Sequence, residues 1–430
     1  MGESTVTTSA NALRRAYVPG FFKALEDHSL NLWKLTSEFQ QSKSIGEGLY
    51  FPFIGYSPKN LSGSSTGNTL FRDTVQRGQI QGSVAPIEVA ANFKISALLK
   101  NVGTKEGAFN GGEYAQHVEE TSGDLAKALN RFSAISHGTC RLAVVESTVT
   151  STQFVAECSE TNPYGVSNLM VGDTISNYPD DTTGSVINDG YRITAIDPET
   201  RTVTVDNSAT WTAGTMIYRT GMRGLAMNGL RGLIGTATTL ATLHGQARGT
   251  YSYLNPVFKN LYSGGNPRDL AEEDIRTVLN RVKGNGGEGL DVLAGNPGVA
   301  DSFLRINATL RQYNVFKGEV FNQQLGKDPS KMVFGFEGSN LRYFQDVNLQ
   351  PRTLFLMKKG SLRKFEAMPM GWFDDDGKML RQVVGISGGV VGHRAAWEAQ
   401  MGWQGNLGIQ DPNQVGLITG VIDTFNGDTV

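Results

Sequence analysis

Hydrophobic and polar residues alternate in two runs in the first quarter of the chain, from Leu49 to Ile54 and from Val84 to Ile95. An alternation with a period of two is typical of strands that bury one face, so we expect the runs to form a long hairpin. The chain between them, above all 60–68, is polar and too poor in hydrophobic side chains to fold alone. It is either a flexible loop tip or a segment that a partner orders. We therefore expect one extended loop over residues 49–96.

The first 48 residues combine a polar, Ser/Thr-rich start with a cluster of large apolar side chains. The cluster includes Phe21, Phe22, Leu32 and Trp33. These side chains are many for a short segment without a core of its own, so we expect them to be buried against the body or against a neighbouring chain. The pattern indicates an N-terminal arm over residues 1–48.

A helical pattern follows the extended loop. Asn110 with Glu113 three residues later is a helix-start signal, and apolar residues recur at helical spacing from there to about Ser136. A helix of that length measures roughly 40 Å at about 1.5 Å per residue, which is long enough to brace two regions of a flat subunit. Gly123 is a weak point inside it, at a cost of about 1 kcal/mol relative to alanine.

Residues 141–220 read as a separate block of short strands. The clearest hairpin runs from Arg192 to Val205, with Asp197-Pro198 starting its turn and with Ile193 and Ala195 expected on one face. We predict an inserted small barrel or sandwich. Its expected strands are 144–149, 152–156, 169–175, 191–196, 202–205 and 215–218.

Helices and strands alternate in the last half of the chain. Asn266-Pro267 is expected to cap a helix that has acidic residues in its first turn and stops at Gly284. A second helix is expected from Pro297 to Tyr313, and a β-rich region at the C-terminal end. The strands expected here are 290–294, 332–336, 341–344 and 353–357. The whole pattern indicates an α+β chain.

Composition excludes several classes of function. The chain has 39 basic and 41 acidic residues, a net charge of −2, which is far from the basic balance of a tight DNA-binding protein. No apolar run approaches the roughly 20 residues that span a bilayer, so we expect no membrane contact. Cys140 and Cys158 have no second Cys or His at zinc-ligand spacing and are expected to be reduced, packed thiols.

One motif matches the nucleophile elbow of hydrolases. Gly385 to Gly389 fits G-x-S-x-G, with Ser387 in the nucleophile position and His393 as the histidine that follows it. The motif lies too near the C-terminal end for the usual acid and then histidine to follow after further strands. We expect a glycine-rich bend between two β segments.

Other motifs also favour structural interpretations. Gly284 to Gly289 fits G-x-G-x-x-G, but a helix precedes it and a strand follows, the reverse of a dinucleotide site, so it reads as a helix stop. Asp374 to Gly377 lacks the alternation of a calcium loop and reads as a hairpin turn. The histidines are scattered singly and receive no chemical role; they are His28, His117, His137, His244 and His393.

The order of arm, extended loop, long helix, β insertion and α/β region resembles the major capsid proteins of tailed bacteriophages, which share the Hong Kong 97 capsid fold. The resemblance extends from about Ala12 to Ile422. The stretches that carry it are Gln81 to Ser96, Asp124 to Arg131, Met227 to Leu233, Leu243 to Gly245, Phe334 to Gly338 and Phe344 to Asp346. The chain departs from some members in lacking a long helical extension that acts as a built-in scaffold.

The resemblance implies a division of the chain and a role for each part. The implied parts are an arm at 1–48, an extended loop at 49–96, a peripheral domain with the long helix at 97–140, an accessory β domain on the outer surface at 141–220, and the axial domain with the remaining peripheral strands at 221–430. The implied function is self-assembly into an icosahedral head around double-stranded DNA, with no catalysis and no cofactor.

Partners follow from the same resemblance. They are further copies in pentamers and hexamers, a separate scaffolding protein, a portal and an optional decoration protein, with packaged DNA contacted only non-specifically. The implied location is the virion, after assembly in the host bacterial cytoplasm. The candidate residues for contact between subunits are Phe21, Phe22, Leu32, Trp33, Lys59, Asn60, Leu61, Leu70 and Phe71.

Three other functions remain open at this point. The same fold serves encapsulin-like bacterial compartment shells, a reading that the length and the insertion disfavour. A serine hydrolase would use Ser387 and His393, and a secreted β-rich adhesin or tail component would normally show a signal sequence or repeats. Some relatives also crosslink Lys to Asn, but no catalytic carboxylate environment can be recognised near Lys59.

Overall fold

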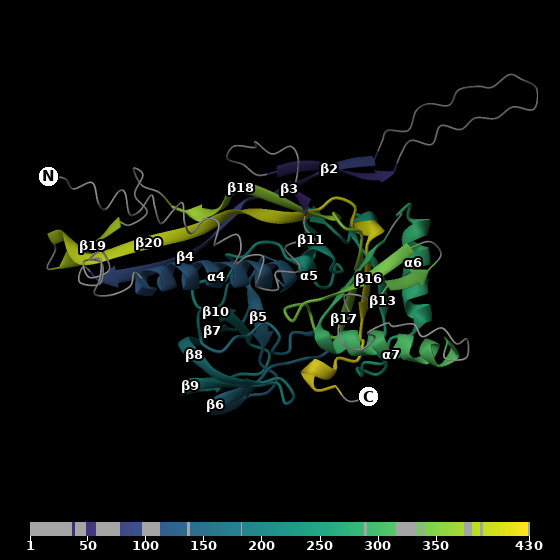
Figure 1. The fold of residues 1–430 in the computed structure, drawn as a ribbon, viewed down its shortest axis with the longest axis horizontal. Coiled ribbons are helices and arrows are strands. Elements are labelled where there is room, and N and C mark those ends of the chain that lie inside the picture. Colours follow the sequence, from purple (N-terminus) through teal and green to yellow (C-terminus); the bar gives the residue numbers. More distant parts are fainter. Residues whose placement is uncertain are drawn as a thin grey trace, which may run out of the picture.

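The computed structural model combines an elongated layer of long strands and one helix, a compact α/β part and a small barrel (Figure 1). In Figure 1 the barrel lies below the helix of the elongated layer, and the α/β part lies at the other end of the molecule. The residues that the structure describes are 37–38, 49–56, 78–96, 112–135, 138–181, 183–287, 290–314, 333–336, 339–373, 381–387 and 390–428.

The elongated layer is a twisted sheet covered by one helix. Strand β20 pairs with β18, β19 and β4, and β1 adds two residues in parallel to β18. Helix α4 lies along β4 and β20 and buries Leu125, Leu129 and Phe132 against them. The bounds are β1 Ser37–Glu38, β4 Ile87–Ser96, α4 Gly112–Ile135, β18 Leu362–Trp372, β19 Arg381–Ser387 and β20 Val390–Ile409. The predicted long helix is confirmed.

The predicted hairpin is wrong in its second strand. Strand β2 (Leu49–Tyr56) pairs with β3 (Gly78–Val84), and the run predicted as one strand from Val84 to Ile95 divides between β3 and β4. Pro86 lies at the division, where a residue without an N–H cannot continue a ladder. Strand β4 then joins β20, so only β2 and β3 form the described base of the extended loop.

Six strands after α4 form the predicted inserted domain. They pair in the order β5-β10-β7-β8-β9-β6. The Glu146 N–H donates to the Val155 carbonyl (2.9 Å) and the Glu157 N–H to the Val144 carbonyl (2.8 Å), which joins the first strand to the last. The sheet is therefore a closed barrel. Its strands are β5 Arg141–Val144, β6 Val149–Val155, β7 Thr174–Tyr178, β8 Asn188–Asp197, β9 Thr202–Trp211 and β10 Met216–Arg219.

The barrel hairpin differs from prediction at one residue. Strands β8 and β9 meet through the predicted turn after Asp197, and Ile193 is buried as expected. A register shift between Ile193 and Ala195 then exposes Ala195 and turns Ile196 inward opposite Val203. A bulge moves all later side chains to the other face, so simple alternation fails there.

A mixed six-stranded sheet forms the α/β part and separates two cores. Its order is β13-β21-β17-β14-β16-β15. Leu293 and Ile418 face helices α6 and α7, whereas Ala294 and Leu417 face the main core that continues toward the barrel and α4. The elements are β13 Val257–Asn260, α6 Glu272–Gly284, β14 Val292–Gly295, α7 Pro297–Asn314, β15 Val333–Phe336, β16 Ser339–Gln345, β17 Thr353–Met357 and β21 Gly416–Thr419.

Helix α6 starts later than predicted. Asn266 exchanges backbone hydrogen bonds with Ser263, and Arg268 pairs with the chain beside Val421, so sheet-like pairing takes these residues out of the helix. The first turn is closed instead by Asp274, whose carboxylate accepts from the Ala271 N–H at 2.9 Å. The predicted end at Gly284 is confirmed.

Candidate functional site at the barrel and the hairpin base

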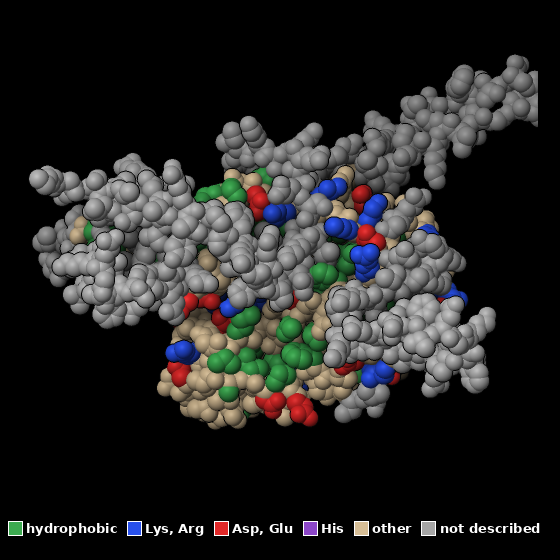
Figure 2. Space-filling model, in the orientation of Figure 1, with side chains coloured by type: hydrophobic (Ala, Val, Ile, Leu, Met, Phe, Trp, Pro, Cys, Tyr) green, Lys and Arg blue, Asp and Glu red, His purple; other side chains and the backbone are tan. Residues whose placement is uncertain are grey.

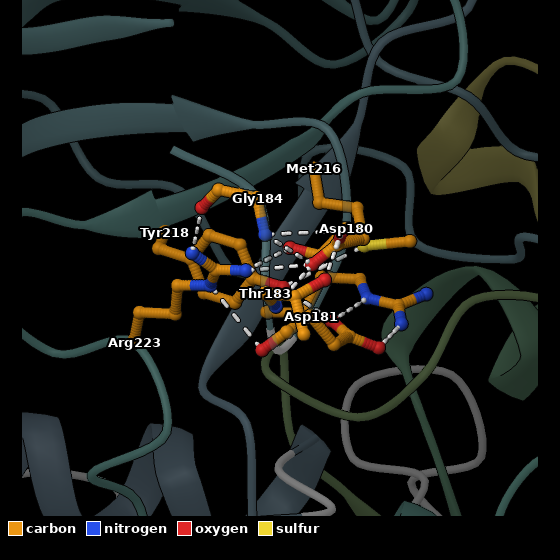
Figure 3. Close-up of polar contacts among 8 residues, drawn as sticks. Asp180, Asp181, Thr183, Gly184, Met216, Tyr218 and Arg223 are labelled. Carbon is orange, nitrogen blue, oxygen red and sulfur yellow. Dashed lines mark hydrogen bonds and ion pairs between the residues drawn. The ribbon is translucent and has the colours of Figure 1, made fainter. Parts of the chain in front are cut away.

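A polar cluster joins three parts of the barrel wall (Figure 3). Asp181, which follows β7, accepts hydrogen bonds from Arg141 of β5 through Nε (2.9 Å) and through Nη2, and also from the Tyr218 hydroxyl of β10. Burial raises the pKa of Tyr218 to about 12, so this hydroxyl stays protonated and remains a donor. The cluster fixes the chain that leaves β7.

Arg223 clamps the same turn from the segment after the barrel. Its guanidinium donates to the carbonyl oxygens of Asp180 (2.8 Å), Asp181 (3.2 Å) and Gly184 (2.5 Å), and to the Asp180 carboxylate (2.7 Å). The planar group also stacks 4.3 Å from the centre of the Tyr178 ring. A guanidinium with four protein acceptors works as a clamp and has little left to offer a bound anion.

A shallow pocket of about 550 Å³ opens beside this clamp. Two glycines leave bare backbone in its wall, since Gly221 and Gly224 have φ of 76° and 71° and no atom of the described residues lies within 4 Å of where a Cβ would be. A side chain at either position would be strained by the left-handed backbone. The lining residues are Tyr178, Asp181, Gly221, Arg223 and Gly224.

The charged groups that line the pocket are already engaged by other groups of the chain. Its acid and its base are held by hydrogen bonds within the barrel wall, and no Ser, Cys or His is among its lining residues. Within the described ranges, no group of three or more His, Cys, Asp or Glu side chains is placed to hold a metal ion.

A buried ion pair and a buried hydrogen bond from a paired arginine attach the barrel to the rest of the chain. Arg131 of α4 contacts the Asp173 carboxylate at 2.5 Å, and the two side chains are 4% and 9% exposed. Arg352 donates to the carbonyl of Cys158 in the barrel and pairs through Nε with Asp428 at 2.8 Å. Removing one partner of such a buried pair typically costs about 3–5 kcal/mol, so the barrel has a fixed orientation.

His244 attaches the base of the extended loop to the body. Its carbonyl accepts from the Ser83 N–H in β3 (3.0 Å), and its Nε2 accepts from the Ile409 N–H at the end of β20 (3.2 Å). The imidazole stacks on Phe53 of β2 with ring centres 5.9 Å apart. Burial, with a contribution from Arg248, lowers the pKa of His244 to about 3, so the ring is neutral at neutral pH.

Each candidate contact residue from the sequence lies outside the described residues. This holds for Phe21, Phe22, Leu32, Trp33, Lys59, Asn60, Leu61, Leu70 and Phe71, and also for the turn from Asp374 to Gly377. Their roles remain predictions.

Other motifs and residues from the sequence analysis lie in the part of the chain that the structure describes. Ser387 of β19 pairs with Val390 of β20, so a strand follows the motif, whereas a hydrolase elbow needs a helix there; the predicted β segments on either side of the motif are confirmed. Helix α6 ends at Gly284, as the helix-stop reading requires. Cys140 and Cys158 are buried and free, and burial raises the pKa of each thiol to about 12.

Sequence reasoning missed the clamp and the His244 contacts. The run from Tyr178 to Asp181 contains a Pro-Asp turn signal, which could have marked the turn itself. Nothing local indicates that Arg223, about 40 positions later, holds that turn.

Exposed aliphatic side chains concentrate near the barrel. Figure 2 shows hydrophobic side chains gathered over the part of this face where the barrel meets the rest of the chain. Four of the seven large hydrophobic residues exposed in the described part lie in the barrel or directly after it: Val171, Val186, Ile187 and Leu225. None of the described helices is both long and apolar enough to cross a membrane.

Comparison with solved structures defines the class of fold. No protein-family model and no curated protein matches this chain. The capsid asymmetric unit of cyanophage A-1(L) is similar over 90% of both chains, with a TM-score of 0.53 and 10% identity. The chain therefore has the fold of a phage capsid subunit, and the predicted fold class is confirmed.

Two further solved structures are similar to this chain. One, from Mycobacterium phage Bobi, is 9% identical, covers 90% of this chain and 89% of its own, and has a TM-score of 0.41. The other is a virus-like particle from Pyrococcus furiosus, with 11% identity, 95% and 99% coverage and a TM-score of 0.36.

Proposed function

We propose that this chain is the major capsid protein of a tailed phage and assembles into an icosahedral head around double-stranded DNA. The observation that carries the proposal is the likeness to the cyanophage A-1(L) capsid unit over nine-tenths of both chains. The elongated layer of long strands with α4 provides a stiff body, which a thin shell needs. The elements far from that body, the barrel and the extended loop, then provide contacts.

The parts of the chain take the roles that the sequence resemblance implies. Residues 1–48 are the arm, 49–96 the extended loop, 97–140 the peripheral domain, and 221–430 the axial domain with remaining peripheral strands. In Figure 1 the β2–β3 pair leaves the body on the side opposite the barrel, which supports a loop that reaches neighbouring copies. Each copy then touches several neighbours, so modest interfaces add up to a stable shell of pentamers and hexamers.

The charge distribution supports an outward position for the barrel at 141–220. This block has ten acidic residues, four arginines and no lysine, a formal charge of −6, whereas the rest of the chain has 35 basic and 31 acidic residues, or +4. Packaged DNA is a dense polyanion, so an acidic domain is repelled from the interior. DNA is contacted only non-specifically in this arrangement.

The other proposed partners and properties follow from the capsid role. A separate scaffolding protein controls curvature, a portal occupies one vertex, and a decoration protein is an optional outer partner. Assembly takes place in the host bacterial cytoplasm and the product is the virion. The chain acts without catalysis, in keeping with the strand that follows the motif at Ser387.

The proposal is tested by purifying the chain expressed alone and together with the products of its neighbouring genes. Size-exclusion chromatography and negative-stain electron microscopy are expected to show rings, capsomers or closed shells. A chain that stays monomeric in both preparations overturns the proposal. Particles from the native source that hold nuclease-protected DNA support a phage head, whereas particles filled with a protein cargo favour the encapsulin-like shell.

A further inference from the structure

We propose that one face of the barrel is a contact surface for the body of a second copy of this chain. The face is defined by Tyr178, Val186, Ile187, Gly221, Gly224 and Leu225. The inference rests on the proposed capsid function and names a surface that assembly uses. It joins three observations: an exposed apolar rim, a rigid support and an unequal distribution of charge.

The apolar rim borders the shallow pocket. Val186, Ile187 and Leu225 are 43%, 45% and 54% exposed, which is high for large aliphatic side chains. The Ile187 N–H donates to the Asn177 carbonyl (2.8 Å), which places Ile187 beside Tyr178, and Leu225 directly follows the lining residue Gly224. Such a patch is stabilised when another surface covers it.

The support under the rim is rigid. The Asp180 carboxylate accepts from the N–H groups of Thr183 (2.7 Å) and Gly184 (3.0 Å), and Arg223 holds the same turn from the other side. Val186 therefore lies two residues after Gly184, and Leu225 two residues after Arg223, the two residues that this hydrogen bond joins. A surface that is already ordered loses little conformational entropy on binding, which favours affinity from a small area.

Charge selects the partner. Two barrels, each with a formal charge of −6, repel one another, whereas the remainder of a neighbouring copy carries +4 and is complementary. A neighbouring copy is also present at very high effective concentration in a growing shell. The body of a second copy fits this face better than a second barrel.

The test compares two variants in the assembly assay. The double variant Ile187→Ser with Leu225→Ser removes the rim, and Val171→Ser removes a side chain that is 63% exposed elsewhere on the barrel. Both are expected to fold, as circular dichroism and thermal melting of the unassembled chain will show. The double variant is expected to lower the yield of closed shells at least about tenfold, with Val171→Ser near the unmodified yield.

The possible outcomes separate this inference from the proposed function. Shells of the double variant at the unmodified yield overturn the inference and leave the capsid function standing. Equal losses in both variants also overturn it, because the effect is then a general loss of apolar surface. Normal shells that no longer bind a co-expressed phage protein assign the face to that protein instead of a second copy. An unmodified chain that never assembles overturns the proposed function itself.

Discussion

The barrel and the extended loop are attached to the same body by different chemistry. The barrel is held by a buried ion pair, Arg131 with Asp173, and by a buried hydrogen bond from the Arg352 guanidinium to the Cys158 carbonyl. The base of the loop is held by neutral groups: the imidazole of His244, the ring of Phe53 and backbone hydrogen bonds. The first kind of attachment leaves a buried charge behind when it breaks, and the second does not.

Because of this difference, we expect the barrel and the extended loop to differ in how far each can change its orientation relative to the body. An uncompensated buried charge is costly, so the barrel keeps one orientation relative to α4 and the α/β sheet. Neutral contacts can break and reform at a lower cost, so the loop can adopt more than one angle. Under the proposed capsid function, a fixed body with an adjustable extended loop is the combination that a subunit of both pentamers and hexamers needs.

The largest expected effect comes from breaking the barrel attachment. Arg131→Ala leaves the Asp173 carboxylate buried and unpaired, so we expect the free energy of unfolding to fall by about 3–5 kcal/mol. Urea denaturation of the unassembled chain measures it. Arg276→Ala is the control, since its pair with Glu272 is exposed on α6 and is expected to change stability by less than about 1 kcal/mol. Similar losses in both variants contradict a special role for Arg131.

The loop attachment is expected to weaken in acid. Since the pKa of His244 is about 3 in the folded chain and 6.5 for an ordinary histidine, its stabilising effect is complete above about pH 6.5 and decreases as the pH falls toward 3. The loss approaches about 1.4 kcal/mol per pH unit in that range. Hydrogen exchange of the Ser83 amide, which donates to the His244 carbonyl, measures the opening of the hairpin base.

A substitution isolates the imidazole from other acid effects. His244→Gln keeps a side-chain acceptor for the Ile409 N–H but cannot gain a proton in this range. The exchange rate of Ser83 is expected to lose most of its dependence on pH in this variant. An unchanged pH dependence assigns the effect to another group.

The clamp under the barrel face gives a smaller and more local effect. Arg223→Lys loses the planar stack on Tyr178 and most of the hydrogen bonds to the turn, because an ammonium cannot reproduce the fork of a guanidinium. Amide exchange of Thr183 and Gly184 is expected to become about 10–100-fold faster. Arg201→Lys, at a half-buried position elsewhere on the barrel, is expected to leave both amides unchanged.

Local patterns predict the elements well where neighbouring residues decide them. Helix α4 and the turn after Asp197 form as expected because spacing and turn residues agree there. Predictions are wrong where distant segments compete: β4 pairs with β20 and not within its predicted hairpin, and pairing of Arg268 beside Val421 makes α6 start later. No local pattern contains these partners.

The sequence predicts that contact surfaces exist but not which residues form the one on the barrel. An exposed arm and loop follow from apolar residues without a core, but the barrel face depends on Arg223 meeting a turn about 40 residues earlier. His244 reads as a lone histidine in sequence, and only the fold brings Ser83, Phe53 and Ile409 around it. Such sites arise from tertiary contacts.

The smallest expected effect stiffens the helix that carries the barrel anchor. Gly123 lies inside α4, and no atom of the described residues lies within 4 Å of the position where a Cβ would be placed. Gly123→Ala is therefore expected to raise the free energy of unfolding by about 0.5–1 kcal/mol, because alanine loses less backbone entropy in a helix. Gly235→Ala is the opposite control, since its Cβ would lie 2.5 Å from the Arg231 carbonyl oxygen and must destabilise the chain. If Gly123→Ala also destabilises the chain, α4 depends on flexibility at this point, and the barrel is less firmly held than the pair of Arg131 with Asp173 implies.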